Sequence, residues 1–299
     1  MVDNITPGFD EVYEREEFQR TFKYRGSKTY YWDYRAVNAL KRTDQTLIFV
    51  HGFRGDHHGL IKIVTELPQY RIIVPDLPGF GISARLPEEQ NVDGYVHYLN
   101  DFIDSLDLDK KPVIVGHSFG SVVSAKYAVD YPDKLTKLVL LNPIAEATNK
   151  GIKGLFTKGS VGLFNLSTKA PEVVSNAIMK NPIMVRGLSI FMAKTKDKDL
   201  RKEIHAEHDE HFSSFTDKDG LVEAFRASVN SSISDFGYKI KTPTLLVAGD
   251  KDDIAPLQTQ ISLQYAIKDS QLKVIKNVGH LIHYEKSDEA AKVIDTFVR

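Results

Sequence analysis

A serine at the centre of a glycine-flanked pentapeptide has the setting of a nucleophile. The segment Gly116-His117-Ser118-Phe119-Gly120 follows the apolar run Val113–Val115 and precedes a plausible helix from Ser121 to Ala128. The pattern Gly-x-Ser-x-Gly is typical of a sharp strand-to-helix turn that exposes the serine hydroxyl in a strained conformation. Small residues two positions to each side let the strand and the helix approach closely. We therefore predict that Ser118 is a nucleophile and that the backbone N–H of Phe119 stabilises the oxyanion.

A serine hydroxyl is a poor nucleophile until a base takes its proton, and a histidine follows the last predicted strand. His280 ends the segment Asn277-Val278-Gly279-His280, which comes directly after the apolar run Leu272–Ile275. His283 is a nearby competitor, which we interpret as a surface or packing residue at the start of the final helix. The base needs a buried carboxylate to fix its tautomer and stabilise the imidazolium.

Three acidic residues compete for this carboxylate role. Asp250, Asp252 and Asp253 all lie between Gly249 and Pro256, in a turn that follows an apolar run. Because they are so close together, spacing alone does not select the one that faces His280.

The elements that must position these residues are short apolar runs, each followed by a turn and a helical stretch. This alternation predicts a parallel sheet covered by helices on both faces. In such sheets the ligand crevice lies outside the carboxyl ends of the strands, where every candidate residue falls. An additional strand pair is predicted around the turn at Arg25–Gly26. The predicted strands are Gln19–Tyr24, Lys28–Tyr34, Thr46–Val50, Arg71–Val74, Val113–Val115, Leu135–Leu141, Thr244–Ala248 and Leu272–Ile275.

The strand rhythm breaks between Asn142 and about Asp235, where glycines and prolines interrupt helical pieces. We predict a core formed by residues 1–142 and 236–299, with residues 143–235 inserted as a helical cap over the strand ends. Apolar residues of the cap are candidates for a substrate pocket. These candidates are Phe156, Phe164, Leu166, Met179, Met184 and Phe191.

Four motifs together resemble those of the α/β-hydrolase superfamily, in its group of capped esterases, lipases and carbon–carbon bond hydrolases. The chain order of nucleophile, acid and histidine also fits that family. The resemblance covers about Thr46 to Arg299 and implies an α/β-hydrolase fold with a mostly parallel central sheet, flanking helices and an inserted helical cap. The motifs are His51-Gly52-Phe53, Asp76–Ser83, the pentapeptide around Ser118, and the turn Gly249–Pro256 followed by Gly279-His280.

The resemblance also implies roles for individual residues. In similar sequences the acid turn reads Gly-x-x-Asp with a proline four residues later, which favours Asp252; Asp250 and Asp253 would then be turn-forming or solvent-facing. The backbone N–H of Phe53 would be the second oxyanion donor. His51 would hold its loop by hydrogen bonding, and Asp76–Ser83 would be a structural loop beside the site.

This set of residues predicts acyl transfer to water, in which Ser118 attacks a carbonyl, His280 moves the proton and Asp252 orients His280. A serine nucleophile argues against relatives that use an aspartate there, such as haloalkane dehalogenases and epoxide hydrolases. A small to medium carboxylic ester is the first substrate class we expect. One alternative is hydrolysis of a carbon–carbon bond in a diketone-like substrate, with Arg186 holding an acid group; a cofactor-free perhydrolase is another. The non-enzymatic alternative is a ligand receptor on the same fold.

Two groups of histidines invite a metal hypothesis, which the sequence does not favour. Adjacent residues such as His57 and His58 point apart on a helix or strand. Among His205, His208 and His211, the spacing lets two meet but turns the third away. We therefore expect no metal site at His57 and His58. For the second group we expect a charged, solvated cap helix, with incidental zinc binding as a minor alternative. The sequence has neither a G-x-G-x-x-G nor a G-x-x-x-x-G-K-[ST] motif, so we expect no nucleotide cofactor.

Composition narrows the classes of partner. The 299 residues include 39 Lys+Arg and 40 Asp+Glu, for a net charge of -1, which argues against nucleic acid or an anionic membrane surface as a partner. The chain has no cysteine, which excludes disulfides and thiolate sites. No apolar run approaches the ~20 residues of a membrane span, and the acidic N-terminal segment does not resemble a signal peptide. We expect a cytoplasmic protein with a small-molecule substrate, and apolar cap residues are compatible with a homo-oligomer.

Overall fold

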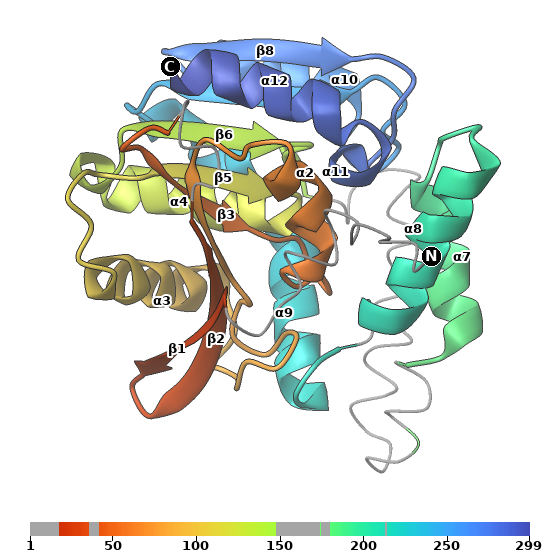
Figure 1. Cartoon of the computed structure of the whole chain (residues 1–299), viewed down its shortest axis with the longest axis horizontal. Helices are drawn as coiled ribbons and strands as arrows, with labels where there is room; N and C mark the ends of the chain where they lie inside the picture. The colour runs from red at the N-terminus through yellow and green to blue at the C-terminus, as the bar shows by residue number, and fades with distance from the viewer. Residues whose placement is uncertain (1–17, 36–41, 148–173, 175–179, 213) are drawn as a thin grey trace, which may run out of the picture.

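The computed structural model describes residues 18–35, 42–147, 174, 180–212 and 214–299 (Figure 1). Eight strands form one sheet in the order β1-β2-β4-β3-β5-β6-β7-β8. All neighbouring strands from β4 to β8 pair in parallel, whereas β2 pairs antiparallel with both β1 and β4. The prediction of a mostly parallel sheet is therefore confirmed. The strands are β1 Gln19–Tyr24, β2 Ser27–Tyr34, β3 Thr46–Val50, β4 Arg71–Pro75, β5 Val113–His117, β6 Lys137–Leu141, β7 Thr244–Gly249 and β8 Ser270–Ile275.

The central strands are apolar throughout because helices cover both faces of the sheet. Every residue of β3, β5 and β7 is buried. Successive side chains point to opposite faces, so Ile48 and Val50 join one hydrophobic cluster while Leu47 and Phe49 join the other. Burial on both faces explains why these strands lack the alternation of a half-exposed strand.

Each face of the sheet has its own helices. The face with Ile48 and Val50 is covered by α3 (Val92–Ser105) and α4 (Phe119–Asp130), and the hydrophobic cluster between them is called the first core cluster. The face with Leu47 and Phe49 is covered by α2 (Ile61–Thr65) and α12 (Ser287–Val298), which contribute to the second core cluster. Two further helices follow the last strands, α10 (Leu257–Ala266) and α11 (Ile282–Glu285). Short 3-10 helices are η2 His58–Leu60, η3 Pro132–Lys134, η4 Ile233–Asp235 and η5 Gly237–Lys239.

The chain between β6 and β7 leaves the sheet and forms the helical insertion. Its described helices are α7 (Pro182–Met192), α8 (Lys198–His211) and α9 (Lys218–Asn230). Figure 1 shows α7 and α8 side by side beyond the carboxyl ends of the strands, whereas the apolar residues of α9 belong to the first core cluster. The division into residues 1–142 with 236–299 and a cap of residues 143–235 stays a prediction. Within the described ranges, no helix combines the length and apolar character that crossing a membrane requires.

Candidate active site

Ser118 lies at the tight turn between β5 and α4. Its backbone has φ 52° and ψ −120°, a conformation that costs about 1–3 kcal/mol for a non-glycine residue. A Cβ atom on Gly116 would lie 2.5 Å from both the carbonyl oxygen of Gly120 and Oγ of Ser124, and one on Gly120 would overlap the carbonyl of Val50. The predicted need for glycine on both sides of the serine is confirmed, because a methyl group at either position would separate the strand from the helix.

The hydroxyl of Ser118 begins a chain of hydrogen bonds that ends at a buried carboxylate. Ser118 Oγ lies 2.8 Å from His280 Nε2, and His280 Nδ1 lies 2.8 Å from Asp252 Oδ2. Because the carboxylate accepts the Nδ1 proton, Nε2 is left as the acceptor that faces the serine hydroxyl. This tautomer is the one in which the imidazole can take a proton from Ser118.

The carboxylate of Asp252 is held in place by its own turn. Its Oδ1 accepts hydrogen bonds from the backbone N–H groups of Ile254 at 2.8 Å and Ala255 at 2.9 Å. Burial alone would raise the pKa of Asp252, but the charge of His280 and these hydrogen bonds hold it below its ordinary value. Asp252 is thus ionised at neutral pH and can stabilise a positive charge on His280.

The other two acids of this turn have different partners. Asp250 accepts a hydrogen bond from the backbone N–H of Asn277 at 2.6 Å and so closes the turn. Asp253 is largely exposed and forms an ion pair with Lys194 at 2.8 Å. The structure therefore selects Asp252 as the acid that contacts His280, as the resemblance implied.

Sequence reasoning missed Asn142, which connects the loops that carry the site. Its Nδ2 donates to the carbonyl oxygens of Gly279 and His280, both at 2.9 Å, and its Oδ1 accepts the N–H of Gly249 at 2.8 Å. Asn142 itself follows β6, so it joins the ends of three neighbouring segments. The only signal in the sequence was an Asn-Pro pair directly after an apolar run, which also suits an ordinary turn.

Two further histidines pack behind His280. His117 Nε2 lies 3.1 Å from the carbonyl oxygen of His280, so this nitrogen must carry the proton. Burial and the nearby charge of His280 lower the pKa of His117 to about 3, which keeps it neutral. The His283 ring packs 4.1 Å from that of His117 and is buried, which confirms a packing role for it.

The loop after β3, which carries the expected oxyanion donor Phe53, lies beside Ser118. A Cβ atom on Gly52 would lie 3.1 Å from Cβ of Ser118, so the backbone that leads to Phe53 touches the serine. His51 Nε2 accepts the N–H of Leu77 at 2.8 Å, while its Nδ1 donates to the carbonyl oxygen of Gly52 at 2.8 Å. His51 thus holds its loop by hydrogen bonding, as expected. The oxyanion role of the N–H groups of Phe53 and Phe119 stays a prediction.

The loop Asp76–Ser83 connects the core to the insertion. Phe80 pairs with Phe215 in an isolated bridge, and the N–H of Gly81 donates to the carbonyl oxygen of Ser214 at 3.0 Å. Asp76 accepts from the backbone N–H of His57 at 2.8 Å, so its carboxylate also fixes the loop after β3. These contacts support the structural role expected of this loop.

A cavity of about 990 Å³ opens above Ser118 and His280, between the core and the insertion. This is at the upper end of the volumes typical of small-molecule sites. Of the predicted pocket residues, Met184 and Phe191 line the cavity; Arg186 is not among the lining residues and pairs with Asp209. Four others lie outside the described residues, namely Phe156, Phe164, Leu166 and Met179.

A second arginine, missed by sequence reasoning, does line this cavity. Arg54 directly follows Phe53 and is only 3% exposed, with Nε donating to the carbonyl oxygen of Phe212 at 2.9 Å. Burial lowers the pKa of Arg54 to about 10, so the side chain keeps its positive charge at neutral pH. The arginine that lines the cavity therefore belongs to the core and directly follows the expected oxyanion donor Phe53, whereas Arg186 of the insertion is not a lining residue.

The helix α8 is charged and largely solvated, as expected, but two of its histidines do not belong to the solvated face. His205 and His208 are buried, with Nδ1 atoms 2.6 Å and 2.8 Å from the hydroxyl of Ser189. A hydroxyl has one proton to donate, so one of these two imidazoles accepts from Ser189 and the other donates to it. Burial, reinforced by the charges of His205 and Arg186, lowers the pKa of His208 to about 4.

His211 is turned away from this pair, as its spacing predicts, and contacts the core. Its ring stacks on that of His58, with centroids 3.8 Å apart and planes 14° from parallel. The expectation that His57 and His58 point apart is wrong, because the chain turns into η2 there and their ring centroids lie 3.8 Å apart. Their partners still differ, since His57 bonds to Asp76 and His58 to Asp56.

Comparison with known proteins places this geometry in a family. The chain is 26% identical to Lipase 1 of Psychrobacter immobilis over 251 residues, 83% of this chain and 74% of that protein. It is 27% identical to 2-hydroxy-6-oxo-2,4-heptadienoate hydrolase of Pseudomonas putida over 242 residues, 79% of this chain and 81% of that one. The solved bromoperoxidase of Bacillus anthracis superposes with a TM-score of 0.77 at 19% identity, over 94% of this chain and 99% of that one. Residues 45–287 match the model of the alpha/beta hydrolase fold, and the chain therefore belongs to the α/β-hydrolase fold family.

Proposed function

We propose that this protein is a serine hydrolase that cleaves small to medium carboxylic esters through an acyl-enzyme intermediate. The observation that carries the proposal is the continuous hydrogen-bonded chain from Ser118 through His280 to Asp252, with 2.8 Å at each step. Ser118 and His280 line a cavity large enough for a substrate. The strained backbone of Ser118 supports the same role, because strain of this kind gathers at functional sites.

The proposed reaction begins when Ser118 Oγ attacks the ester carbonyl carbon and His280 Nε2 takes the hydroxyl proton. Asp252 then stabilises the imidazolium by charge and by its hydrogen bond to Nδ1. The backbone N–H groups of Phe53 and Phe119 hold the oxyanion, each contributing about 3–4 kcal/mol of transition-state stabilisation. His280 gives its proton to the departing alcohol, and a water activated by the same imidazole hydrolyses the acyl-enzyme.

An acyl group is the substrate part that suits the cavity best. The insertion contributes apolar side chains to the cavity wall, which favour a hydrocarbon chain over a sugar or a nucleotide. These residues are Met184, Leu188, Phe191, Met192, Phe212 and Phe225. The similarity to a lipase supports the same substrate class.

A second candidate is hydrolysis of a carbon–carbon bond in a diketone-like substrate that bears a carboxylate. The observation that favours it is Arg54, a buried cation that lines the cavity and could pair with such a carboxylate. Similarity to 2-hydroxy-6-oxo-2,4-heptadienoate hydrolase points the same way. Arg186, the cation first considered for this role, pairs with Asp209 instead.

The test combines covalent labelling with turnover. Wild type, Ser118→Ala and Ser228→Ala are treated with a fluorophosphonate probe and assayed on p-nitrophenyl esters from short to long chain. Ser228 is a matched control, because it lines the same cavity but donates its hydroxyl proton to the carbonyl oxygen of Phe225. We expect wild type and Ser228→Ala to be labelled and active, and Ser118→Ala to be neither. Full activity of Ser118→Ala would refute the proposed mechanism.

An Arg54 variant distinguishes the two proposed substrate classes. A vinylogous diketone acid is assayed beside the esters with wild type and Arg54→Met. Carbon–carbon hydrolysis predicts that wild type cleaves the diketone acid and that Arg54→Met raises its KM, while neutral esters are little affected. If wild type is labelled at Ser118 but cleaves neither substrate, a receptor role on this fold is favoured.

A further inference from the structure

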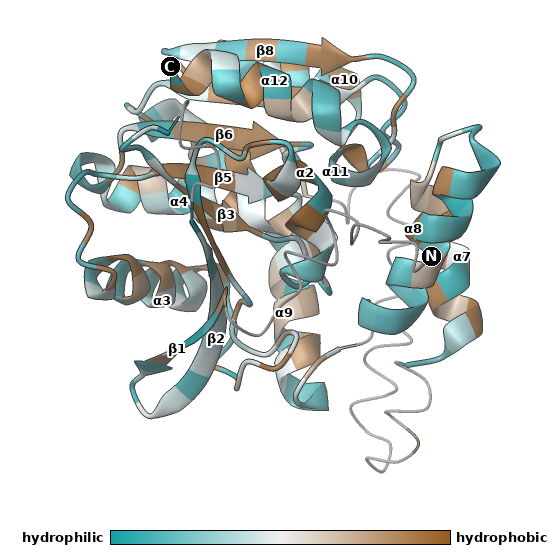
Figure 2. Ribbon diagram, viewed as in Figure 1, coloured by the Kyte–Doolittle hydropathy of each residue, from teal (hydrophilic) through white to brown (hydrophobic). Residues whose placement is uncertain are grey.

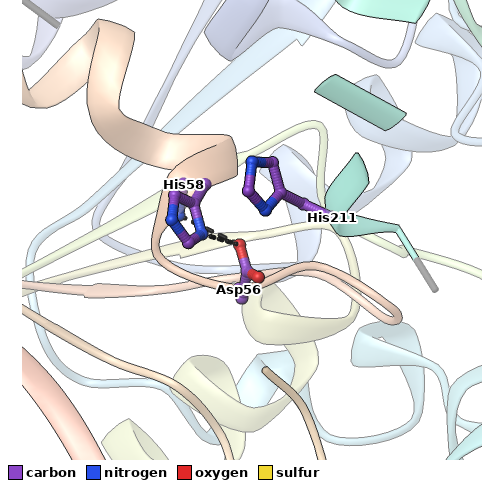
Figure 3. A group of neighbouring side chains, drawn as sticks. All are labelled: Asp56, His58 and His211. Carbon is purple, nitrogen blue, oxygen red and sulfur yellow. Dashed lines mark hydrogen bonds and ion pairs between the residues drawn. The ribbon is translucent and has the colours of Figure 1, made fainter. Parts of the chain in front are cut away.

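Three potential metal ligands meet where the insertion touches the core. Asp56 and His58 belong to the segment after β3, and His211 is the last residue of α8. Each offers one ligand atom, and these atoms all lie within 4.8 Å of one another. Figure 3 shows the three side chains close together, with dashed lines marking the contact between His58 and Asp56.

The two core ligands are held in position by their own turn. Asp56 is 3% exposed, and its Oδ1 accepts the backbone N–H of His58 at 3.0 Å and lies 3.2 Å from His58 Nδ1. The neighbouring His57 is fixed independently, because its ring stacks on Trp32 at 3.2 Å between centroids and its Nδ1 lies 3.0 Å from Asp76 Oδ1. The turn is therefore ordered by contacts that do not involve His211.

We propose that Asp56, His58 and His211 bind a divalent transition-metal ion with the ligand preference of Zn²⁺, which ties α8 to the loop after β3. Two imidazoles and one carboxylate are a ligand set that Zn²⁺ accepts, with water in the fourth position. The nitrogen ligands argue against Mg²⁺ and Ca²⁺, which prefer oxygen.

The carboxylate and one imidazole of the proposed site already have the spacing of coordinated ligands. Zn–N and Zn–O bonds of about 2.0–2.2 Å at tetrahedral angles place neighbouring ligand atoms roughly 3.3 Å apart. Asp56 Oδ1 and His58 Nδ1 already lie 3.2 Å apart. His211 is the ligand that must move: its ring is stacked nearly parallel on that of His58, and it has to rotate out of this stack before both imidazoles can direct a nitrogen at one ion.

A carboxylate one helical turn before His211 can orient that ring. Glu207 Oε2 lies 4.0 Å from His211 Nε2. Metal-binding histidines usually donate their second ring N–H to a carboxylate, which fixes the tautomer and strengthens the ligand. At 4.0 Å the two groups do not form a hydrogen bond, so Glu207 would take this role only once His211 has rotated to coordinate through its other ring nitrogen.

The position of the site gives the ion a structural effect on the cavity. Asp56, Glu207 and His211 line the cavity that contains Ser118. A bound ion would join the insertion to the loop that follows Phe53, and so would fix the distance between the two walls. This inference does not depend on the chemistry proposed for Ser118.

The test measures metal binding directly. Chelator-treated full-length protein is titrated with ZnCl₂ by calorimetry and with CoCl₂ by visible absorption, which reports tetrahedral coordination. We expect one ion per chain in wild type and a melting temperature that rises with Zn²⁺ and falls again with EDTA. His211→Ala, His58→Ala and Asp56→Asn should each weaken binding by at least about 10- to 100-fold, the loss typical of residues that merely orient a ligand.

His97 is the matched control, because it is an exposed histidine on α3, outside this cluster. His97→Ala should bind Zn²⁺ like wild type. Equal affinity in wild type and His211→Ala, or loss of binding in His97→Ala, would show that surface histidines bind the ion adventitiously and would overturn the proposal. Should His211→Ala fail to fold, the isosteric Asp56→Asn and the Co²⁺ spectrum of wild type decide the same question.

Discussion

The central sheet and the helix α8 of the insertion differ in how many of their residues are buried and in how apolar those residues are. Every residue of β5 and β7 is buried, and nearly all of their side chains are apolar. Of the 14 residues of α8, only Ile204, His205 and His208 are buried, and two of these are polar. Figure 2 shows the contrast as brown central strands beside a largely teal α8.

The pair α7–α8 is attached to the core partly by polar contacts. The backbone N–H of Lys194 donates to Glu285 Oε1 at 3.0 Å, Arg54 donates to the carbonyl of Phe212, and Lys62 pairs with Glu203 at 2.6 Å. A hydrogen bond contributes about 0.5–1.5 kcal/mol net, whereas burying a large apolar side chain contributes about 1.5–3 kcal/mol. The comparison suggests a division of roles, in which the core sets the geometry of Ser118, His280 and Asp252 and the insertion shapes the cavity.

The largest effect is expected from the core carboxylate. Asp252→Asn should lower kcat by about 10⁴-fold with little loss of stability, because the amide cannot stabilise the imidazolium and favours the wrong tautomer. Steady-state kinetics and thermal melting check this. Asp250→Asn is the matched control and should keep most of its activity, since Asp250 bonds to the backbone of Asn277 and pairs with Lys276, away from His280. Equal losses in the two variants would contradict the assignment of the acid.

Truncating an apolar side chain should cost much more free energy of unfolding in the central sheet than on α7. Leu246, in β7, is 0% exposed, so Leu246→Ala should lower the free energy of unfolding by about 2–5 kcal/mol. Ile190, in α7, is 59% exposed, and Ile190→Ala should change it by less than about 0.5 kcal/mol. Urea denaturation measures both. A large cost for Ile190→Ala would contradict the comparison and would indicate that a partner subunit covers α7.

Acid should weaken the insertion through its buried histidines. Burial lowers the pKa of His208 to about 4 from an ordinary 6.5, so the unfolded chain binds this proton more readily. The contribution of neutral His208 to the free energy of unfolding is fully present above pH 6.5 and is lost as the pH falls toward 4. The loss is at most about 3 kcal/mol for this group. Denaturation at neutral and acidic pH should show a smaller loss in His208→Gln than in wild type. The exposed histidine His97 is the control: His97→Gln should lose as much stability on acidification as wild type does. If His97→Gln also loses less stability, the effect comes from removing any histidine and not from the burial of His208.

The smallest effect is expected from the ion pair between Lys194 and Asp253. Because Asp253 is 55% exposed, Asp253→Asn should cost less than about 1 kcal/mol, and still less at high salt. Thermal melting at two salt concentrations measures this, and kcat should stay near the wild-type value. A loss of activity comparable to that of Asp252→Asn would show that the roles of the two neighbouring acids are wrongly divided.

The sequence by itself determined the parts of this protein that depend on contiguous residues. Ser118 and its glycines could be identified because the tight turn imposes steric demands within five positions. The parallel sheet could be predicted because strands buried on both faces must be continuously apolar. His280 followed from its place after the last strand, where the carboxyl edge of such a sheet must lie.

Only the tertiary structure decided the contacts between distant segments. Asp252 meets His280 across 28 positions, and residues from the turn alone gave no reason to prefer it to its neighbours. Arg54 lines the cavity, whereas Arg186 does not, and no sequence pattern distinguishes the two. His58 meets His211 although the two are far apart in the sequence. The physical reason is that polar side chains on loops and on the insertion carry no periodic pattern, so their partners are set by how the insertion packs on the core.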